Sequence, residues 1–107
     1  MQKLEETLRA LGLNQTYTGY ENLIKAAQIV MADRHTLYSV TKSIYMPIAE
    51  ERGCCWSAIE RSIRTAVKRA WKLNPELIKT MAGYSLAIQP TAAEFIEMIA
   101  LYAQRTE

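Results

Sequence analysis

The feature that most constrains this chain is the spacing of three small or apolar residues near its middle. Ala49, Gly53 and Ile59 occupy relative positions 5, 9 and 15 of a helix-turn-helix pattern. Alanine leaves room where two helices cross, glycine adopts the positive φ of a tight turn, and isoleucine buries the inner face of the second helix. The pattern therefore predicts a short helix over residues 47–52, a turn, and a second helix over residues 57–72.

Apolar periodicity and capping residues predict helices along the rest of the chain. A first helix carries Leu4, Leu8 and Leu11 and stops at Gly12, and a second begins with a Thr18–Glu21 capping box and ends near Asp33. A third helical stretch covers residues 36–51, and Pro47 must either kink it or break it and open a fresh helix.

The C-terminal half carries three helix-start signals. Ser57 and Glu60 form a capping box for the basic helix, Asn74 and Pro75 start a helix that stops at Gly83, and Pro90 with Thr91 and Glu94 starts the last one. Residues 84–88 are expected to form an extended loop. We expect one all-α domain over residues 1–107, with about six helices and a winged-helix-like helix-turn-helix without a clear wing.

Composition excludes several classes of protein. Half of the residues are hydrophobic and 22% are charged, which is typical of globular proteins and excludes disorder. No apolar run resembles a membrane span or an export signal, so we expect a cytoplasmic protein. The adjacent Cys54 and Cys55, with the single His35, supply neither a metal-ligand set nor a catalytic constellation. We therefore expect no metal, no cofactor and no enzyme activity.

Positive charge is concentrated on one predicted helix. Residues 52–72 hold six basic residues and one acidic residue, a net charge of +5, whereas the other seven basic and ten acidic residues give −3. A domain with one basic face and an acidic body is typical of a module that presents that face to a polyanion. Basic faces also occur on helices that are merely solvated, and a helical protein-interaction domain that binds an acidic partner is the alternative function.

The helix over residues 57–72 has two distinct faces at about 100° per residue. Four polar residues fall within roughly 60° of Arg61, and they are Arg64, Thr65, Lys68 and Lys72. The opposite side is apolar and carries Ile59, Ile63, Ala66, Val67 and Ala70. Because the major groove of DNA admits an α-helix, this pattern predicts a sequence-specific DNA-binding domain.

Residue chemistry suggests which residues of this helix contact DNA bases and which contact the DNA backbone. Arg61 suits a bidentate bond to guanine, and Glu60 suits a bond from cytosine N4, unless Glu60 instead completes the capping box with Ser57. The sequence leaves these two roles of Glu60 open. The expected backbone or further contacts are Ser57, Arg64, Thr65, Lys68 and Lys72. Trp56 packs as a staple or lies against a DNA sugar.

Short stretches spread over nearly the whole chain match one family, at residues 19–20, 43–49, 59–64, 70–71, 83–84, 90–91 and 94–96. In these stretches the chain resembles the C-terminal effector domain of the sporulation master response regulator of endospore-forming bacteria. The resemblance implies an all-helical domain that binds a short DNA box related to TGTCGAA, often in tandem copies. It also implies base contacts from Glu60 and Arg61, and further contacts from Arg64 and Ser57.

The resemblance implies protein partners as well. The segment over residues 72–81, with Asn74, Glu76 and Lys79, is expected to contact an RNA polymerase sigma factor, and the last helix is expected to pair two domains on tandem boxes. Ala58, Thr65 and Lys68 depart from the family pattern, as do residues 54–56. The family also carries a phosphorylated receiver domain, which we do not expect within residues 1–107. The chain is then either a fragment of a two-domain regulator or a stand-alone effector.

Overall fold

A computed structural model describes residues 2–15 and 18–106. This part of the chain holds six α-helices and no strand. They are α1 (Gln2–Ala10), α2 (Thr18–Ala32), α3 (Met46–Arg52), α4 (Trp56–Leu73), α5 (Pro75–Ala82) and α6 (Ala92–Thr106), with a 3-10 helix η1 (Arg34–Ser39) and a π-helix η2 (Thr41–Tyr45) between α2 and α3. The expected all-α class is confirmed. None of the described helices is long and apolar enough to cross a membrane.

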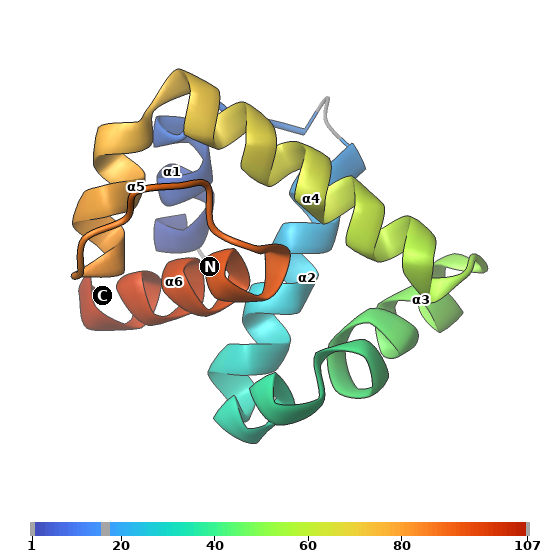
Figure 1. Ribbon diagram of the computed structural model, residues 1–107. Helices are drawn as coiled ribbons and strands as arrows, with labels where there is room; N and C mark the ends of the chain where they lie inside the picture. Colours follow the sequence, from blue (N-terminus) through green and yellow to red (C-terminus); the bar gives the residue numbers. More distant parts are fainter. Residues whose placement is uncertain (1, 16–17, 107) are drawn as a thin grey trace.

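The helices enclose one continuous apolar core. Helix α2 runs through the middle of the molecule and packs against both α4 and α6, while α1 lies against α6 (Figure 1). The predicted stripe of Leu4, Leu8 and Leu11 on α1 is buried, as are Phe95, Ile96 and Ile99 on α6. Helix α4 is thus held along one side by α2, α3 and α6.

Several helix ends lie where the sequence predicts them. Asn74 caps α5 by accepting a hydrogen bond from the Leu77 amide at 3.3 Å, and α5 stops before Gly83. At the start of α6 the Thr91 hydroxyl and the Glu94 carboxylate each accept a bond from the other residue's amide, at 3.1 and 2.8 Å. Helix α2 begins at Thr18, but the side chain of Thr18, and with it the predicted capping box, lies outside the described residues.

The helical stretch expected over residues 36–51 is interrupted, as Pro47 predicts. It divides into the 3-10 helix η1, the π-helix η2 and the short α3. Proline lacks an N–H and its ring clashes with the turn before it, so the backbone widens ahead of Pro47. The Met46 amide bonds to the Thr41 carbonyl in the π pattern, and Pro47 stands in the first turn of α3. Because Val40, Tyr45 and Met46 all have right-handed helical dihedrals, the chain stays helical from η2 into α3, and a π-helix takes the place of the expected break at Pro47.

The predicted start of the basic helix is also corrected. Helix α4 begins at Trp56, its N-cap residue is Cys55, and no side chain accepts a capping bond there. Ser57 consequently lies inside the helix, where it cannot form a capping box with Glu60. The N-cap of a helix is the residue with extended backbone directly before the first helical turn, and in α4 that residue is Cys55 and not Ser57.

Candidate nucleic-acid interface

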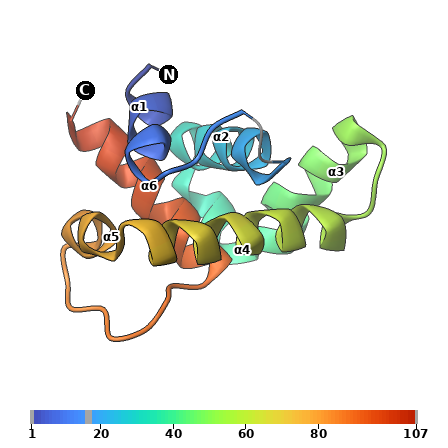
Figure 2. The same ribbon diagram turned by 90° about the horizontal axis from the view of Figure 1, so that it is seen from above.

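Helices α3 and α4 are joined by a turn over residues 53–55. Gly53 has φ +70 and ψ +37, the left-handed conformation that most residues resist. Ala49 and Ile59 are both buried, one in each helix. The conformation and burial that the sequence predicts at these three positions are therefore confirmed. Figure 2 shows α3 lying back beside the N-terminal half of α4.

In Figure 2 the N-terminal half of α4 lies at one edge of the molecule, and the loop between α5 and α6 extends beyond its C-terminal part. The five predicted inward residues, Ile59, Ile63, Ala66, Val67 and Ala70, are all buried. The exposed side carries Arg61, Arg64, Thr65, Lys68, Arg69 and Lys72. At 18 residues α4 is about 27 Å long, so it extends across most of a molecule whose longest dimension is 34 Å. The predicted basic face therefore exists as one exposed surface, which we call the α4 basic face.

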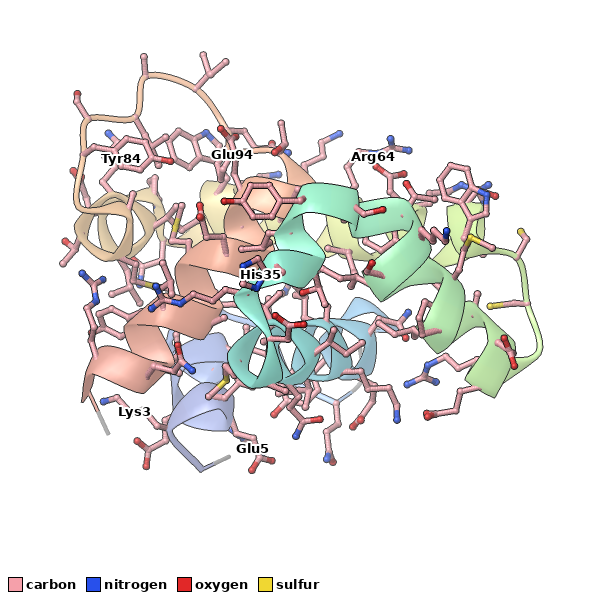
Figure 3. All side chains as sticks on the ribbon, turned by 90° about the horizontal axis from the view of Figure 1, so that it is seen from below. Lys3, Glu5, His35, Arg64, Tyr84 and Glu94 are labelled. Carbon is pink, nitrogen blue, oxygen red and sulfur yellow. The ribbon has the colours of Figure 1, made fainter. Side chains whose placement is uncertain are left out.

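Charged side chains differ between the two edges of the molecule. Figure 3 shows Arg64 on the same edge as Tyr84 and Glu94, whereas Lys3 and Glu5 of α1 lie on the opposite edge. The loop over residues 83–91 projects near the C-terminal end of α4 (Figure 2). Arg64 is consequently remote from the charges of Lys3 and Glu5 at the start of α1.

Glu60 is engaged by Arg64 one turn further along α4. The Arg64 Nη1 atom lies 3.2 and 3.3 Å from the two carboxylate oxygens of Glu60. The Glu60 side chain is only 26% exposed. The predicted capping role of Glu60 is therefore wrong, and its carboxylate stands instead at the border of the α4 basic face.

A hollow of about 420 Å³ lies beside Glu60, between η2, the start of α4 and the start of α6. Tyr45, Trp56 and Thr91 contribute to its wall. Burial raises the pKa of Tyr45 to about 12, and the nearby Glu60 carboxylate adds to this effect. Trp56 remains 44% exposed, so it packs only partly against the protein and keeps a free side next to the basic face.

The two cysteines lie at the turn and are both free and exposed. Cys55 Sγ is 3.2 Å from the Ser57 hydroxyl, and this hydrogen bond lowers the pKa of the Cys55 thiol. The Ser57 side chain is half-buried. Its hydroxyl already has a partner within the protein, and a contact to a phosphate would compete with that partner.

Residues expected to contact a sigma factor follow α4 directly. The Asn74 side chain caps α5 and also donates from Nδ2 to the Ala10 carbonyl at 3.0 Å, so it ties α5 to α1. Glu76 and Lys79 are both exposed, and Lys79 Nζ lies 3.9 Å from Glu76 Oε2. The same ammonium nitrogen is 5.8 Å from the centre of a Trp71 ring. Among the three, Glu76 and Lys79 present their charges to the surface, while Asn74 has structural hydrogen bonds.

The last helix is mostly buried. Its exposed edge carries Glu94, Glu97 and Arg105, and these line a hollow of about 220 Å³ together with Tyr84 of the loop. Arg105 Nη2 donates to the Met81 carbonyl at 3.3 Å, which holds α6 to α5. Among the described residues of α6, Gln104 is exposed together with Glu94, Glu97 and Arg105, and these residues form the edge open to a second protein.

Sequence reasoning missed Asn22, which contacts α4 from inside. Asn22 Nδ2 donates to Ser62 Oγ at 2.7 Å, and the Ser62 hydroxyl donates to the Ile59 carbonyl at 2.8 Å. The available signal was a polar residue between the buried Tyr20 and Leu23 on the inner face of α2. Exposed Arg69 was also missing from the expected contacts, although it lies on the same outer side of α4.

Comparison with known families gives one match that spans this architecture. Residues 4–103 match the family described as Sporulation initiation factor Spo0A C terminal. The matched range extends from the buried stripe of α1 to the last turns of α6, and it includes the α3–α4 pair and the entire α4 basic face.

Proposed function

This chain belongs to the Spo0A C-terminal family of sporulation regulators, whose effector domain binds DNA, and we propose that α4 is the helix through which it reads the DNA sequence. The observation that carries the proposal is the division of α4 into a buried apolar face and an exposed basic face. The inner side packs against the core, so the outer side is presented to solvent. A helix of this kind fits the major groove.

We propose that Arg61 and Glu60 contact base edges. Arg61 is exposed in the N-terminal half of α4, and its guanidinium suits a bidentate bond to guanine. Glu60 accepts from Arg64 in the free protein, so a bond from cytosine N4 would replace an existing charge-assisted bond. The released Arg64 would then reach a phosphate, and this exchange would keep both side chains paired.

The C-terminal part of α4 supports affinity rather than sequence reading. Arg61 and Lys72 are separated by about 16 Å along the helix axis, since each residue rises about 1.5 Å. A straight helix cannot keep both positions at the bases of a curved groove. We therefore propose that Lys68 and Lys72 contact phosphates, together with Ser57, Arg64 and Thr65, and that these contacts carry little sequence information.

Finer properties of the family are also proposals for this chain. We propose that this chain binds a DNA box related to TGTCGAA. Its preferred DNA sequence differs from that box because Ala58, Thr65 and Lys68 depart from the family pattern. We propose that exposed Glu76 and Lys79 contact a sigma factor and that Asn74 supports them as a cap. Pairing of two domains on tandem boxes would use the open edge of α6 around Glu97.

Fluorescence anisotropy with a duplex carrying TGTCGAA and a scrambled duplex, over a salt series, tests the proposal. We expect tighter binding to the box and an affinity that falls steeply as salt rises. Arg61→Ala should cost roughly 1–3 kcal/mol on the box and relax the discrimination. Lys72→Ala should weaken binding to both duplexes about equally and lower the salt slope by about 1.

The outcomes separate the functions. Equal salt-dependent binding to both duplexes would retain DNA binding and discard the inherited box. A reversal of the two variants' effects would overturn the assigned roles of Arg61 and Lys72. No binding to either duplex would favour an acidic protein partner for the α4 basic face.

A further inference from the structure

Asn22 is a polar side chain in the interface between α2 and α4. It is 2% exposed, and its amide nitrogen donates to Ser62 Oγ at 2.7 Å. Ser62 passes the bond on to the carbonyl of Ile59 at 2.8 Å. Asn22 Oδ1 is buried without a hydrogen-bond partner among the described residues, so the bond to Ser62 compensates the burial of the amide nitrogen alone. A directional link thus joins α2 to the main chain of α4.

Gly19 brings the two helices close enough for this link. A Cβ atom at Gly19 would overlap the Ser62 carbonyl oxygen and would lie 3.0 Å from the Ala66 Cβ atom. The first turn of α2 therefore rests directly on the main chain of α4 at Ser62. Asn22 follows Gly19 by three residues and so extends from the same face of α2.

The Asn22–Ser62 bond acts on the rotation of α4 about its own axis, which apolar packing controls only weakly. Burial of Ile63 and Ala66 holds α4 against the core, but hydrophobic contact is not directional. A hydrogen bond is directional and weakens steeply when it bends. The Asn22–Ser62 bond therefore opposes rotation of α4 about its own axis.

Small rotations matter at the outer side of α4. A rotation of about 10° moves a point about 5–6 Å from the helix axis by about 1 Å. Recognition groups must be held within about 0.5 Å of their productive geometry. A bidentate arginine contact is sensitive to this shift, whereas a lysine ammonium on a flexible stem follows a phosphate easily.

We propose that Asn22 is a specificity-determining positioning residue, which acts through Ser62 to set the rotation at which α4 presents Arg61 to the bases. The inference rests on the proposed function of α4. Asn22 itself is buried and does not touch DNA. Loss of the Asn22–Ser62 bond should reduce discrimination between DNA sequences much more than general affinity for DNA.

The experiment compares Ser62→Ala with wild type and with an exposed serine control, Ser39→Ala. A second variant, Asn22→Leu with Ser62→Ala, replaces both partners by apolar groups, which is nearly neutral for stability when shapes match. For each protein the ratio of affinities for the TGTCGAA and scrambled duplexes is measured by anisotropy, and the unfolding midpoint by urea titration. The double variant keeps the test valid if Ser62→Ala folds poorly.

We expect Ser62→Ala to lower the affinity ratio at least about fivefold, while affinity for scrambled DNA stays within about twofold. The double variant should regain the unfolding midpoint without regaining the ratio. Recovery of both together would show a merely structural role and overturn the inference. An unchanged affinity ratio in Ser62→Ala would overturn the role of Asn22 and leave the proposed base contacts standing. A wild-type protein that does not prefer the box would overturn the proposed base contacts as well.

Discussion

Replacing Gly19 by alanine tests how closely α2 and α4 approach. The added Cβ would overlap the carbonyl oxygen of Ser62 and press on Ala66, and Cβ atoms essentially never come within 3.0 Å of another heavy atom. The carbonyl belongs to the main chain of α4 and cannot rotate away as a side chain would. The first turn of α2 must therefore move outward from α4.

The magnitude follows from two opposing effects. Overpacking of a tight contact costs about 1–3 kcal/mol, whereas alanine gains up to about 1 kcal/mol over glycine inside a helix. We expect Gly19→Ala to lower the free energy of unfolding by about 1–2 kcal/mol. For a domain of this size that corresponds to a fall in Tm of about 5–10 °C.

Urea and thermal unfolding followed by circular dichroism would measure the change. Gly83→Ala is the control, because a Cβ there meets no atom within 4 Å and only the φ of +74 opposes it. Adding Ala66→Gly to Gly19→Ala should not restore stability, since the contact with the Ser62 carbonyl remains. A Gly19→Ala protein more stable than wild type would refute the close approach, because helix propensity alone would then decide the outcome.

Three further predictions concern single side chains. Asn74→Ala should cost about 1–2 kcal/mol in urea unfolding, because α5 loses its cap and its bond to Ala10, while Asn74→Asp should cost less. Tyr45 should titrate near pH 12 when followed by ultraviolet absorbance, because burial favours its neutral phenol in the folded state. The resulting stabilisation of the fold is complete below about pH 10 and is lost as the pH rises toward 12. A titration midpoint near pH 10 for every tyrosine would contradict this prediction. Cys55 should react with a disulfide reagent faster in the wild type than in Ser57→Ala, because the Ser57 hydrogen bond lowers the pKa of its thiol, and an equal rate in the two proteins would count against that bond.

Local sequence signals predicted those helix ends whose hydrogen bonds join residues close together in the chain. Caps such as Asn74, and the Thr91–Glu94 box, join groups three residues apart, so their geometry follows once a helix begins there. The start of α4 shows the limit of such signals. Ser57 and Glu60 have the spacing of a capping box, but the turn after Gly53 places the extended residue at Cys55.

Pro47 shows a second limit. The sequence requires an interruption near this residue, because proline cannot donate a helical hydrogen bond. It does not tell where the chain absorbs the interruption. The π-helix η2 absorbs it ahead of Pro47, where Ile44 and Tyr45 must both be buried against the core.

The sequence by itself determined that this protein is helical, that α4 has one apolar and one basic face, and that its family is that of the sporulation effector domains. Helical periodicity, charge and family stretches are properties of the linear order of residues. Only the tertiary structure decided that Asn22 meets Ser62. Asn22 and Ser62 are 40 residues apart, and no local rule joins them; they meet because Gly19 lets two helix backbones approach.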